Sequence, residues 1–384
     1  MKRRRIVALA VALIMLVMVL GACGGEAEPV ESVAPSADVS QDQPDPSEPS
    51  GGGKDISEVK IGVSVGTLKQ ERWQREIDMF QEYADEKGFE LLVQSAEDDA
   101  QKQASQVENL LSQGIDALLI QSLDADAASP LVEAAHQDGI AVIAYDRFIM
   151  NADLDYYITF DSVKVGEVQA QFVIDNAPTG NYIWLKGGPE DNNAHLVAQG
   201  HRNILQPHID NGDIKIVLEQ WCEGWDPNEA LKHTENGLTI ANNDIQGIIA
   251  SNDGTAGGAI QALAAQDLAG KVPIAGQDAD LSACQRIVEG TQTGTVYKPL
   301  AKLNAAAIQL AVALATGADP STAIDSSLGI WTKLDNDYKE VDSFSVDVIA
   351  IDKDNIDEII IKQDKFQTLE DVYKNIPKDQ WPEI

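Results

Sequence analysis

Short apolar segments alternate with amphipathic ones from residue 59 onward, and this alternation limits the possible folds more than any other feature. The segments VKIGVSV, FELLVQS, DALLIQS and IAVIAYD are separated by stretches of helical periodicity that end at Gly88, Gly114 and Gly139. A strand, a helix, a glycine and another strand form the βαβ unit of a parallel sheet. The pattern therefore predicts an α/β fold.

The same pattern restarts at GNYIWLKGG and continues through IKIVLEQW, IQGIIASND and KVPIAGQD. A chain of 384 residues is too long for one ordinary core. We therefore predict two doubly wound parallel-sheet lobes joined by a three-segment hinge, with crossings near 160–165, 297–299 and 330–337. The first lobe is expected over 58–164 plus 298–336, and the second over 165–297 plus 337–384.

The N-terminus has the composition of an export signal, because MKRRR is followed by the apolar run IVALAVALIMLVMVL. The run approaches the length of a membrane span, but LGAC at its end resembles a bacterial lipobox. We expect a signal peptide over 1–22 and a lipid on Cys23, which would anchor the protein on the outer face of the cytoplasmic membrane. Residues 23–57 are rich in Pro, Ser, Gly and acids and are expected to form a disordered tether.

The charge and the cysteines exclude several functions. A net charge of −34 repels nucleic acid, so no nucleic-acid partner is expected. No CxxC motif or Cys/His cluster has metal spacing, and neither a metal nor a cofactor is expected. Cys222 and Cys284 could form a disulfide in an exported protein, and the sequence leaves this open.

Polar side chains follow the apolar strands at the point where each strand ends. VIAYDRF runs into Asp146 and Arg147, IIASND ends on Asn252, and VPIAGQDAD runs into Gln277 and Asp278. Ligands of open parallel α/β sheets bind outside the carboxyl ends of the strands. The predicted ligand-binding residues are Arg72, Trp73, Asp146, Arg147, Asp191, Asn193, Trp225, Asn252, Asp278 and Lys298.

This set has the chemistry of a site for a neutral cyclic polyol. Carboxylates and amides hydrogen-bond adjacent hydroxyls, Arg and Lys donate to oxygens, and tryptophan offers a flat apolar face. Single members have simpler explanations: Asp191, Asp253 and Asp278 could be helix N-caps, and the two tryptophans could be core residues. Their shared position at the strand ends favours a binding site.

Three motifs could indicate hydrolysis, metal binding or phosphate binding, but the evidence for each is weaker than that for the polyol site. GVSVG at 62–66 matches the nucleophile elbow of hydrolases, but the histidines fall mostly within predicted helices and no catalytic residues are expected. His201 and His208 are expected to be exposed polar residues rather than a metal pair. GTAGGAIQAL lacks the Lys-Ser/Thr of a phosphate-binding loop, and its glycines are expected to permit close helix packing.

The motifs ERWQ, AYDR, DNNA, SNDGTAGGAIQAL, GQDADL and TVYKP resemble those of xylose-binding proteins of ABC sugar importers. These belong to the ribose/galactose-type periplasmic-binding-protein-like family, and the resemblance runs from Val59 to Tyr373. It implies a type I periplasmic binding protein fold and places sugar contacts at the ten residues above, Trp73 being the weakest match. The lipobox and tether depart from the many relatives that are free periplasmic proteins.

The resemblance implies a monomeric solute-binding protein that captures D-xylose between its lobes and delivers it to an ABC permease. Members of this branch also accept glucose, so glucose is a second expected ligand. Alternatives are a binder of another monosaccharide, or a sensor partner that presents sugar to a chemoreceptor or histidine kinase. A sugar-responsive DNA-binding repressor shares this fold, but the N-terminus here is not a helix-turn-helix.

Overall fold

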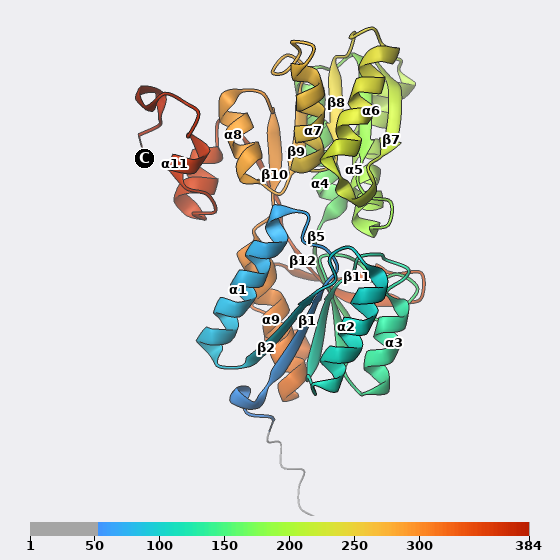
Figure 1. The fold of residues 1–384 in the computed structure, drawn as a ribbon, viewed down its shortest axis with the longest axis vertical. Coiled ribbons are helices and arrows are strands. Elements are labelled where there is room, and N and C mark those ends of the chain that lie inside the picture. Colours follow the sequence, from blue (N-terminus) through green and yellow to red (C-terminus); the bar gives the residue numbers. More distant parts are fainter. Residues whose placement is uncertain (1–52, 384) are drawn as a thin grey trace, which may run out of the picture. The chain divides into compact units, whose positions relative to one another are not determined.

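A computed structural model describes residues 53–383, and residues 52–384 form one compact unit (Figure 1). The predicted signal peptide, Cys23 and nearly all of the tether lie outside the described residues. Within the described part, none of the helices combines the length and apolar character needed to cross a membrane.

The first lobe contains a seven-stranded sheet in the order β11-β12-β5-β4-β3-β1-β2. All its pairings are parallel except that of β11 with β12. The strands are β1 (Lys60–Val65), β2 (Glu90–Ser95), β3 (Ala117–Gln121), β4 (Ala141–Tyr145), β5 (Tyr156–Phe160), β11 (Ile330–Asp335) and β12 (Glu340–Val346). The helices are α1 (Glu71–Lys87), α2 (Ala100–Ser112), α3 (Ser129–Gln137), α9 (Leu300–Thr316) and α10 (Pro320–Ala323).

The second lobe contains a six-stranded sheet in the order β13-β10-β9-β8-β6-β7, with β13 antiparallel to β10. Its strands are β6 (Gly180–Lys186), β7 (Ile214–Trp221), β8 (Gly247–Ala250), β9 (Ile274–Gln277), β10 (Gly294–Tyr297) and β13 (Ile349–Asp352). Its helices are α4 (Ser162–Asn176), α5 (Asn192–Asp210), α6 (Pro227–Ile240), α7 (Asp253–Ala264), α8 (Leu281–Glu289) and α11 (Leu369–Val372), with a π-helical turn over Asp357–Gln363.

Each sheet is buried on both faces, which confirms the doubly wound architecture. In β3, Leu119 packs with α1 and α9, whereas its neighbours Leu118 and Ile120 pack with α2 and α3 on the other face. In β6, Ile183 faces α6 and α7, and Trp184 faces α4 and α5. Side chains alternate between faces along a strand, so a continuous apolar run suits a sheet covered on both sides.

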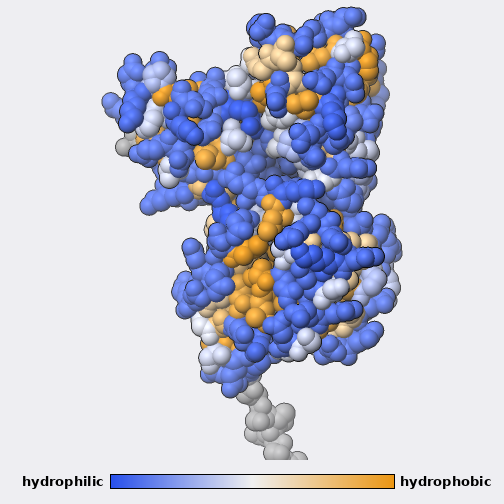
Figure 2. Space-filling view, in the orientation of Figure 1, coloured by the Kyte–Doolittle hydropathy of each residue, from blue (hydrophilic) through white to orange (hydrophobic). Residues whose placement is uncertain are grey.

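Hydrophilic residues cover most of the face shown in Figure 2. An apolar stripe lies on the first lobe between α1 and α2 (Figure 2).

The two sheets repeat one topology. The order β2-β1-β3-β4-β5 in the first sheet corresponds to β7-β6-β8-β9-β10 in the second. In both, the chain reverses its direction of winding next to the first strand of the lobe, which is where open α/β sheets bind ligands at the strands' carboxyl ends. The duplicated sequence pattern therefore builds two equivalent strand-end surfaces.

Two of the predicted crossings coincide with points where the chain passes from one sheet to the other, and the third does not. The chain leaves the first sheet after Phe160 and enters α4 at Ser162, so residues 162–164 belong to the second lobe. It returns between Tyr297 and Leu300. The predicted boundary after residue 336 is wrong, because β12 pairs with β5 in the first sheet and the chain crosses between Val346 and Ile349.

The error concerns the hairpin that precedes the third crossing. Residues 330–346 form an antiparallel hairpin, in which the side chain of Asn336 accepts from the backbone N–H groups of Tyr338 and Lys339. The sequence analysis placed a crossing at 330–337 and predicted neither strand of this hairpin. The long-range pairing of β12 with β5 decides which lobe the hairpin joins.

Candidate functional site

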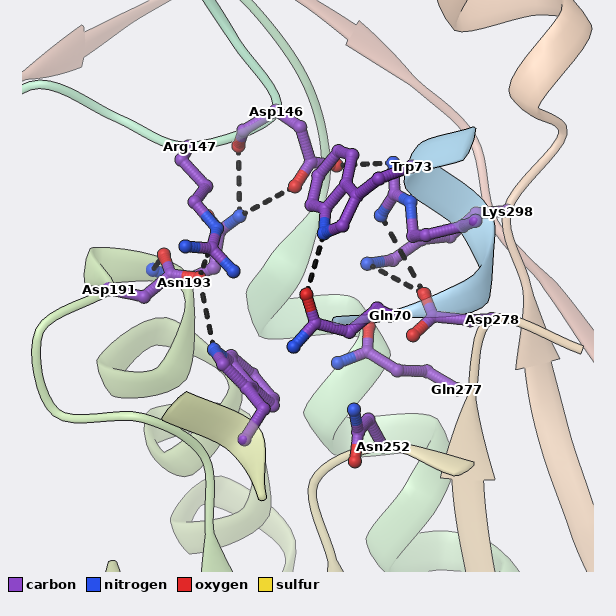
Figure 3. Close-up of a pocket in the computed structure, with 12 residues that line it drawn as sticks. Gln70, Trp73, Asp146, Arg147, Asp191, Asn193, Asn252, Gln277, Asp278 and Lys298 are labelled. Atoms are coloured by element: carbon purple, nitrogen blue, oxygen red, sulfur yellow. Dashed lines mark hydrogen bonds and ion pairs between the residues drawn. The ribbon is translucent and has the colours of Figure 1, made fainter. Parts of the chain in front are cut away.

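All ten predicted site residues line one cavity between the two lobes (Figure 3). Its volume is about 30 Å³. Two further side chains, Gln70 and Gln277, complete the lining. We call this space the site cavity.

The ends of equivalent strands in the two lobes place two carboxylates in the cavity lining. Asp146 follows β4 and Asp278 follows β9, which are equivalent strands of the two sheets. The N–H of Asp146 donates to Ile158 on the next strand, and that of Asp278 donates to Val296 in the same way. Both residues have positive φ, 62° and 97°, which turns their side chains out of the strand direction.

Arg72 joins these two carboxylates across the cleft. Its Nη2 lies 2.9 Å from Asp146 Oδ2, and its Nη1 lies 3.6 Å from Asp278 Oδ1. Its Nε donates to Glu76 Oε1 at 2.6 Å, one turn along α1. The guanidinium is therefore held by carboxylates on three sides. It also lies over the Trp73 ring, 4.3 Å from the ring centroid.

A second cross-cleft contact joins Arg147 to Asp191, with Nε 3.0 Å from Oδ2. The same carboxylate caps α5 by accepting from the N–H of Asn193 and accepts from the indole N–H of Trp225 at 3.2 Å. Asn193 donates to the backbone oxygen of Asp146 at 2.8 Å. One carboxylate thus fixes a helix start, a tryptophan and a cation of the opposite lobe.

Three cations and three carboxylates are buried together in the cavity lining. The cations are Arg72, Arg147 and Lys298, and the carboxylates are Asp146, Asp191 and Asp278; each is at most 7% exposed. Lys298 Nζ lies 3.3 Å from Asp278 Oδ1. These formal charges cancel, which favours a ligand that carries none.

Burial and ion pairing act in opposite directions on the pKa values here. Burial alone would raise the pKa of Asp146, but Arg72, Lys298 and Arg147 together lower it below its usual value. Burial alone would lower the pKa of Arg72, and the carboxylates of Asp146, Glu76 and Asp278 raise it instead. The pair therefore stays ionised over the physiological range.

Gln277 and Gln70 line the cavity but were not predicted as site residues. The sequence contains a signal for the first and none for the second. Gln277 ends β9, where the sequence already shows a polar strand end, and its Nε2 donates to the Ser251 carbonyl at 2.7 Å. Its Oε1 is buried without a hydrogen-bond partner. Gln70 precedes α1 and has no comparable signal, because only the approach of the second lobe brings it to the cavity.

Of the three aspartates that could be helix N-caps, one is. Asp191 is an N-cap as well as a cavity residue, and Asn252 forms a capping box with Thr255 at the start of α7. Asp278 caps no helix. Asp253 lies inside α7, where it accepts from Gln292 and Thr295 and burial raises its pKa to about 7.

The motifs that suggested other chemistry serve the fold. Ser64 of GVSVG is fully buried inside β1 and accepts from Gln103 at 3.2 Å, so it does not lie on an exposed turn. A Cβ on Gly258 would lie 2.0 Å from the Pro227 carbonyl oxygen of α6, which confirms that this glycine permits close packing. No group of three potential metal ligands occurs among the described residues.

Two further expectations concern His201 and the cysteines. His201 is fully buried rather than exposed, and it accepts from the Trp184 indole at 3.1 Å while its Nε2 lies 2.8 Å from Gln169 Oε1. The polar-residue assumption failed because α5 turns this position toward the sheet. Cys222 and Cys284 are both buried free thiols, so the disulfide left open by the sequence is not formed.

This arrangement can enclose and orient a small polar molecule. The lining supplies acceptors, donors and two indole rings, and nearly all of it is shielded from water, where unpaired polar groups cost most. Residues 61–319 match the family model described as periplasmic binding protein domain.

Sequence comparison finds close relatives of this chain. It is 47% identical over 305 residues to the D-xylose-binding periplasmic protein of Escherichia coli, covering 79% of this chain and 90% of that protein. It is 46% identical over 316 residues to the D-xylose-binding periplasmic protein of Haemophilus influenzae, covering 82% and 92%.

Among solved structures, it is similar to a carbohydrate transporter solute binding protein from Chloroflexus aurantiacus in complex with D-glucose. The TM-score is 0.74 at 30% identity, over 82% of this chain and 98% of that one. The family match, the two relatives and the shared fold lead to one conclusion: the chain belongs to the periplasmic binding protein family and is a binding protein rather than an enzyme.

Proposed function

We propose that this protein captures D-xylose in the site cavity and delivers it to an ABC permease. The observation that carries the proposal is the lining of the cavity between the lobes, which consists of three cations, three carboxylates, four amides and two tryptophans. Such a lining can pair the hydroxyls of an uncharged sugar while its own charges cancel.

Eight of the twelve lining residues would contact the sugar in this proposal. Asp146 and Asp278 would accept from ring hydroxyls, Asn252 would donate to or accept from one, and Arg147 and Lys298 would donate to ligand oxygens. Gln277 Oε1, a buried acceptor without a partner, would accept from a further hydroxyl. The tryptophan faces would pack against the C–H groups of the ring.

The names of the relatives support xylose among the monosaccharides. Two relatives at 46–47% identity are D-xylose-binding proteins, and a more distant structure holds D-glucose. The higher identity favours xylose as the preferred ligand, with glucose as the competing one.

The place of the protein in the cell is part of the proposal. Cys23 follows the LGAC motif, and a lipid there would hold the folded unit on the outer face of the membrane through the 23–57 tether. In that position a monomer could reach a permease in the same membrane.

Titration calorimetry with a panel of aldopentoses and aldohexoses tests the ligand. Xylose should bind at least about tenfold more tightly than ribose or lyxose, because an inverted hydroxyl leaves a buried group unpaired at about 1–3 kcal/mol. Tight binding of ribose or galactose without xylose would assign another sugar. Binding of none of the panel would refute monosaccharide capture.

Co-purification tests the partner. Recovery of permease subunits with the membrane-bound protein would support delivery to an importer. Recovery of a chemoreceptor or a histidine kinase ectodomain in their place would assign the sensor role.

A further inference from the structure

Glucose differs from xylose in pyranose form by one exocyclic hydroxymethyl group, so a pocket that prefers xylose needs a wall at that carbon. The lining of the site cavity shows where a ligand could extend. Eleven of its twelve residues are buried, and Gln70 alone among them is partly exposed. An exocyclic group on a bound sugar could therefore extend toward solvent only on the side of Gln70.

A second space adjoins the cavity on this side. It has a volume of about 390 Å³, and we call it the vestibule. It is lined by Lys69, Gln70, Glu71, Gly224, Trp225, Asp226, Pro227, Asn252, Gly254 and Asp280. Only Gln70, Trp225 and Asn252 line both spaces, so these three side chains form the partition between them.

Two of the three partition residues are fixed in place. The Trp225 indole donates to Asp191 and packs on Gly187, where a Cβ would come within 2.5 Å of the ring. The Asn252 side chain accepts from the backbone N–H and from the hydroxyl of Thr255. Neither can move aside without breaking a buried contact.

Gln70 completes the partition and is held from its own lobe. Its Oε1 accepts from the Trp73 indole N–H at 2.6 Å, as Figure 3 shows, and its Nε2 reaches across the cleft to the Gly224 carbonyl at 3.4 Å. The second contact is long for a hydrogen bond and is therefore weak. The side chain of Gln70 thus closes the cavity toward the vestibule without being locked by the second lobe.

We propose that Gln70 is the specificity-determining residue that excludes sugars larger than a pentose from the site cavity. Its side chain occupies the path that an exocyclic hydroxymethyl group would take into the vestibule. This inference rests on the proposed function, and it assigns the discrimination between xylose and glucose to the volume of one side chain.

The test measures the Kd of D-xylose and D-glucose for three variants of residues 52–384, which form one compact unit. Gln70→Ala removes the wall. Gln70→Leu keeps most of its volume but also removes the acceptor of the Trp73 indole, so the comparison of the two isolates volume. Gln74→Ala, an exposed glutamine one turn along α1, is the matched control.

In Gln70→Ala the ratio of the glucose Kd to the xylose Kd should fall at least about tenfold, since a pocket discriminates one added carbon by about 10–200-fold. Gln70→Leu and Gln74→Ala should keep the wild-type ratio. An unchanged ratio in Gln70→Ala, or an equal fall in Gln70→Leu, would overturn the inference.

The outcomes also separate this inference from the proposed function. Wild-type protein that binds neither sugar refutes monosaccharide capture itself. Wild-type protein that binds glucose as tightly as xylose keeps monosaccharide capture and refutes the wall, because no side chain then excludes the larger sugar.

Discussion

Asp146 and Asp278 occupy equivalent strand ends of the two sheets, and both have a backbone conformation that residues other than glycine rarely adopt. Trp225, also in the cavity lining, has a φ of 58°. Such conformations cost about 1–3 kcal/mol each and persist where the surrounding structure fixes them. Their concentration around one cavity is what a pre-organised binding site requires.

We expect Asp278→Asn to weaken xylose binding by about 1–3 kcal/mol, or about five- to 150-fold, without unfolding the protein. Asparagine tolerates positive φ, so the backbone is kept while the charge facing Arg72 and Lys298 is lost. Titration calorimetry and a thermal melt of the same samples measure both effects.

The matched control is Asp267→Asn, which changes an exposed aspartate that also has positive φ and lies outside the cavity lining. It should bind sugar as the wild type does. Unchanged affinity in Asp278→Asn would remove this carboxylate from the binding site.

At the scale of elements, α4 and α5 pack backbone against backbone on one face of the second sheet. A Cβ on Gly166 would lie 2.0 Å from the Val197 carbonyl oxygen, and one on Gly200 would lie 2.0 Å from the Val163 carbonyl oxygen. The two glycines face one another at the helix crossing, and no larger residue fits there without separating the helices.

Gly200→Ala should destabilise the protein by about 1–3 kcal/mol, because the added methyl group meets backbone that cannot rotate away. Gly254→Ala is the control, since its nearest neighbour is 3.4 Å away in ordinary contact. Urea unfolding measures both variants. A Gly200→Ala variant as stable as the control would show that the helices adjust freely.

His201 links three elements, as it lies on α5 and contacts Trp184 of β6 and Gln169 of α4. Burial lowers the pKa of His201 to about 3, from an ordinary value of 6.5. The unfolded chain therefore takes up a proton below pH 6.5 that the folded protein excludes. This contribution to stability is complete above pH 6.5 and is lost as the pH falls toward 3.

Wild-type stability should fall more steeply than that of His201→Gln between pH 6.5 and 4, by up to about 1.4 kcal/mol per pH unit. Glutamine can accept from the Trp184 indole and donate to Gln169 but does not titrate. Urea unfolding across this range measures the difference between the two profiles. Parallel profiles would mean that His201 is protonated in the folded protein.

At the scale of the whole molecule, the two lobes meet through side chains and through backbone. Arg72 to Asp278 and Arg147 to Asp191 are the ion pairs across the cleft, and the N–H of Ala125 donates to the Glu190 carbonyl at 3.0 Å. Three chain crossings connect the lobes, which permits one lobe to rotate against the other.

Sugar should shift the protein toward this closed arrangement, because a ligand held by both lobes binds the closed state better than the open one. Small-angle scattering with and without xylose should show a smaller radius of gyration in its presence. Ribose at the same concentration is the control. An equal radius in all three samples would argue against a ligand-driven hinge.

Cys23→Ser should prevent lipid attachment, so that the protein is released into the medium or keeps its signal sequence. Fractionation of cells and labelling with palmitate, each compared with the wild type, measure this outcome. A variant that is processed and retained in the membrane like the wild type would contradict the anchor.

The amino-acid sequence by itself determined the α/β class, the two lobes and the strand ends that carry the site. Strands, helices and their ends follow from local periodicity, and polar residues such as Asp146 and Asn252 at the ends of apolar strands mark the edge that lines the cavity. For this reason the ten residues chosen from the sequence all line the cavity.

Only the tertiary structure decided which loops meet across the cleft and where the edge strands pair. Gln70 reaches the cavity because the second lobe lies opposite it, and β12 joins the first sheet through pairing with the distant β5. His201 is buried because three elements converge on it. These outcomes depend on contacts between segments far apart in the chain, which local patterns do not encode.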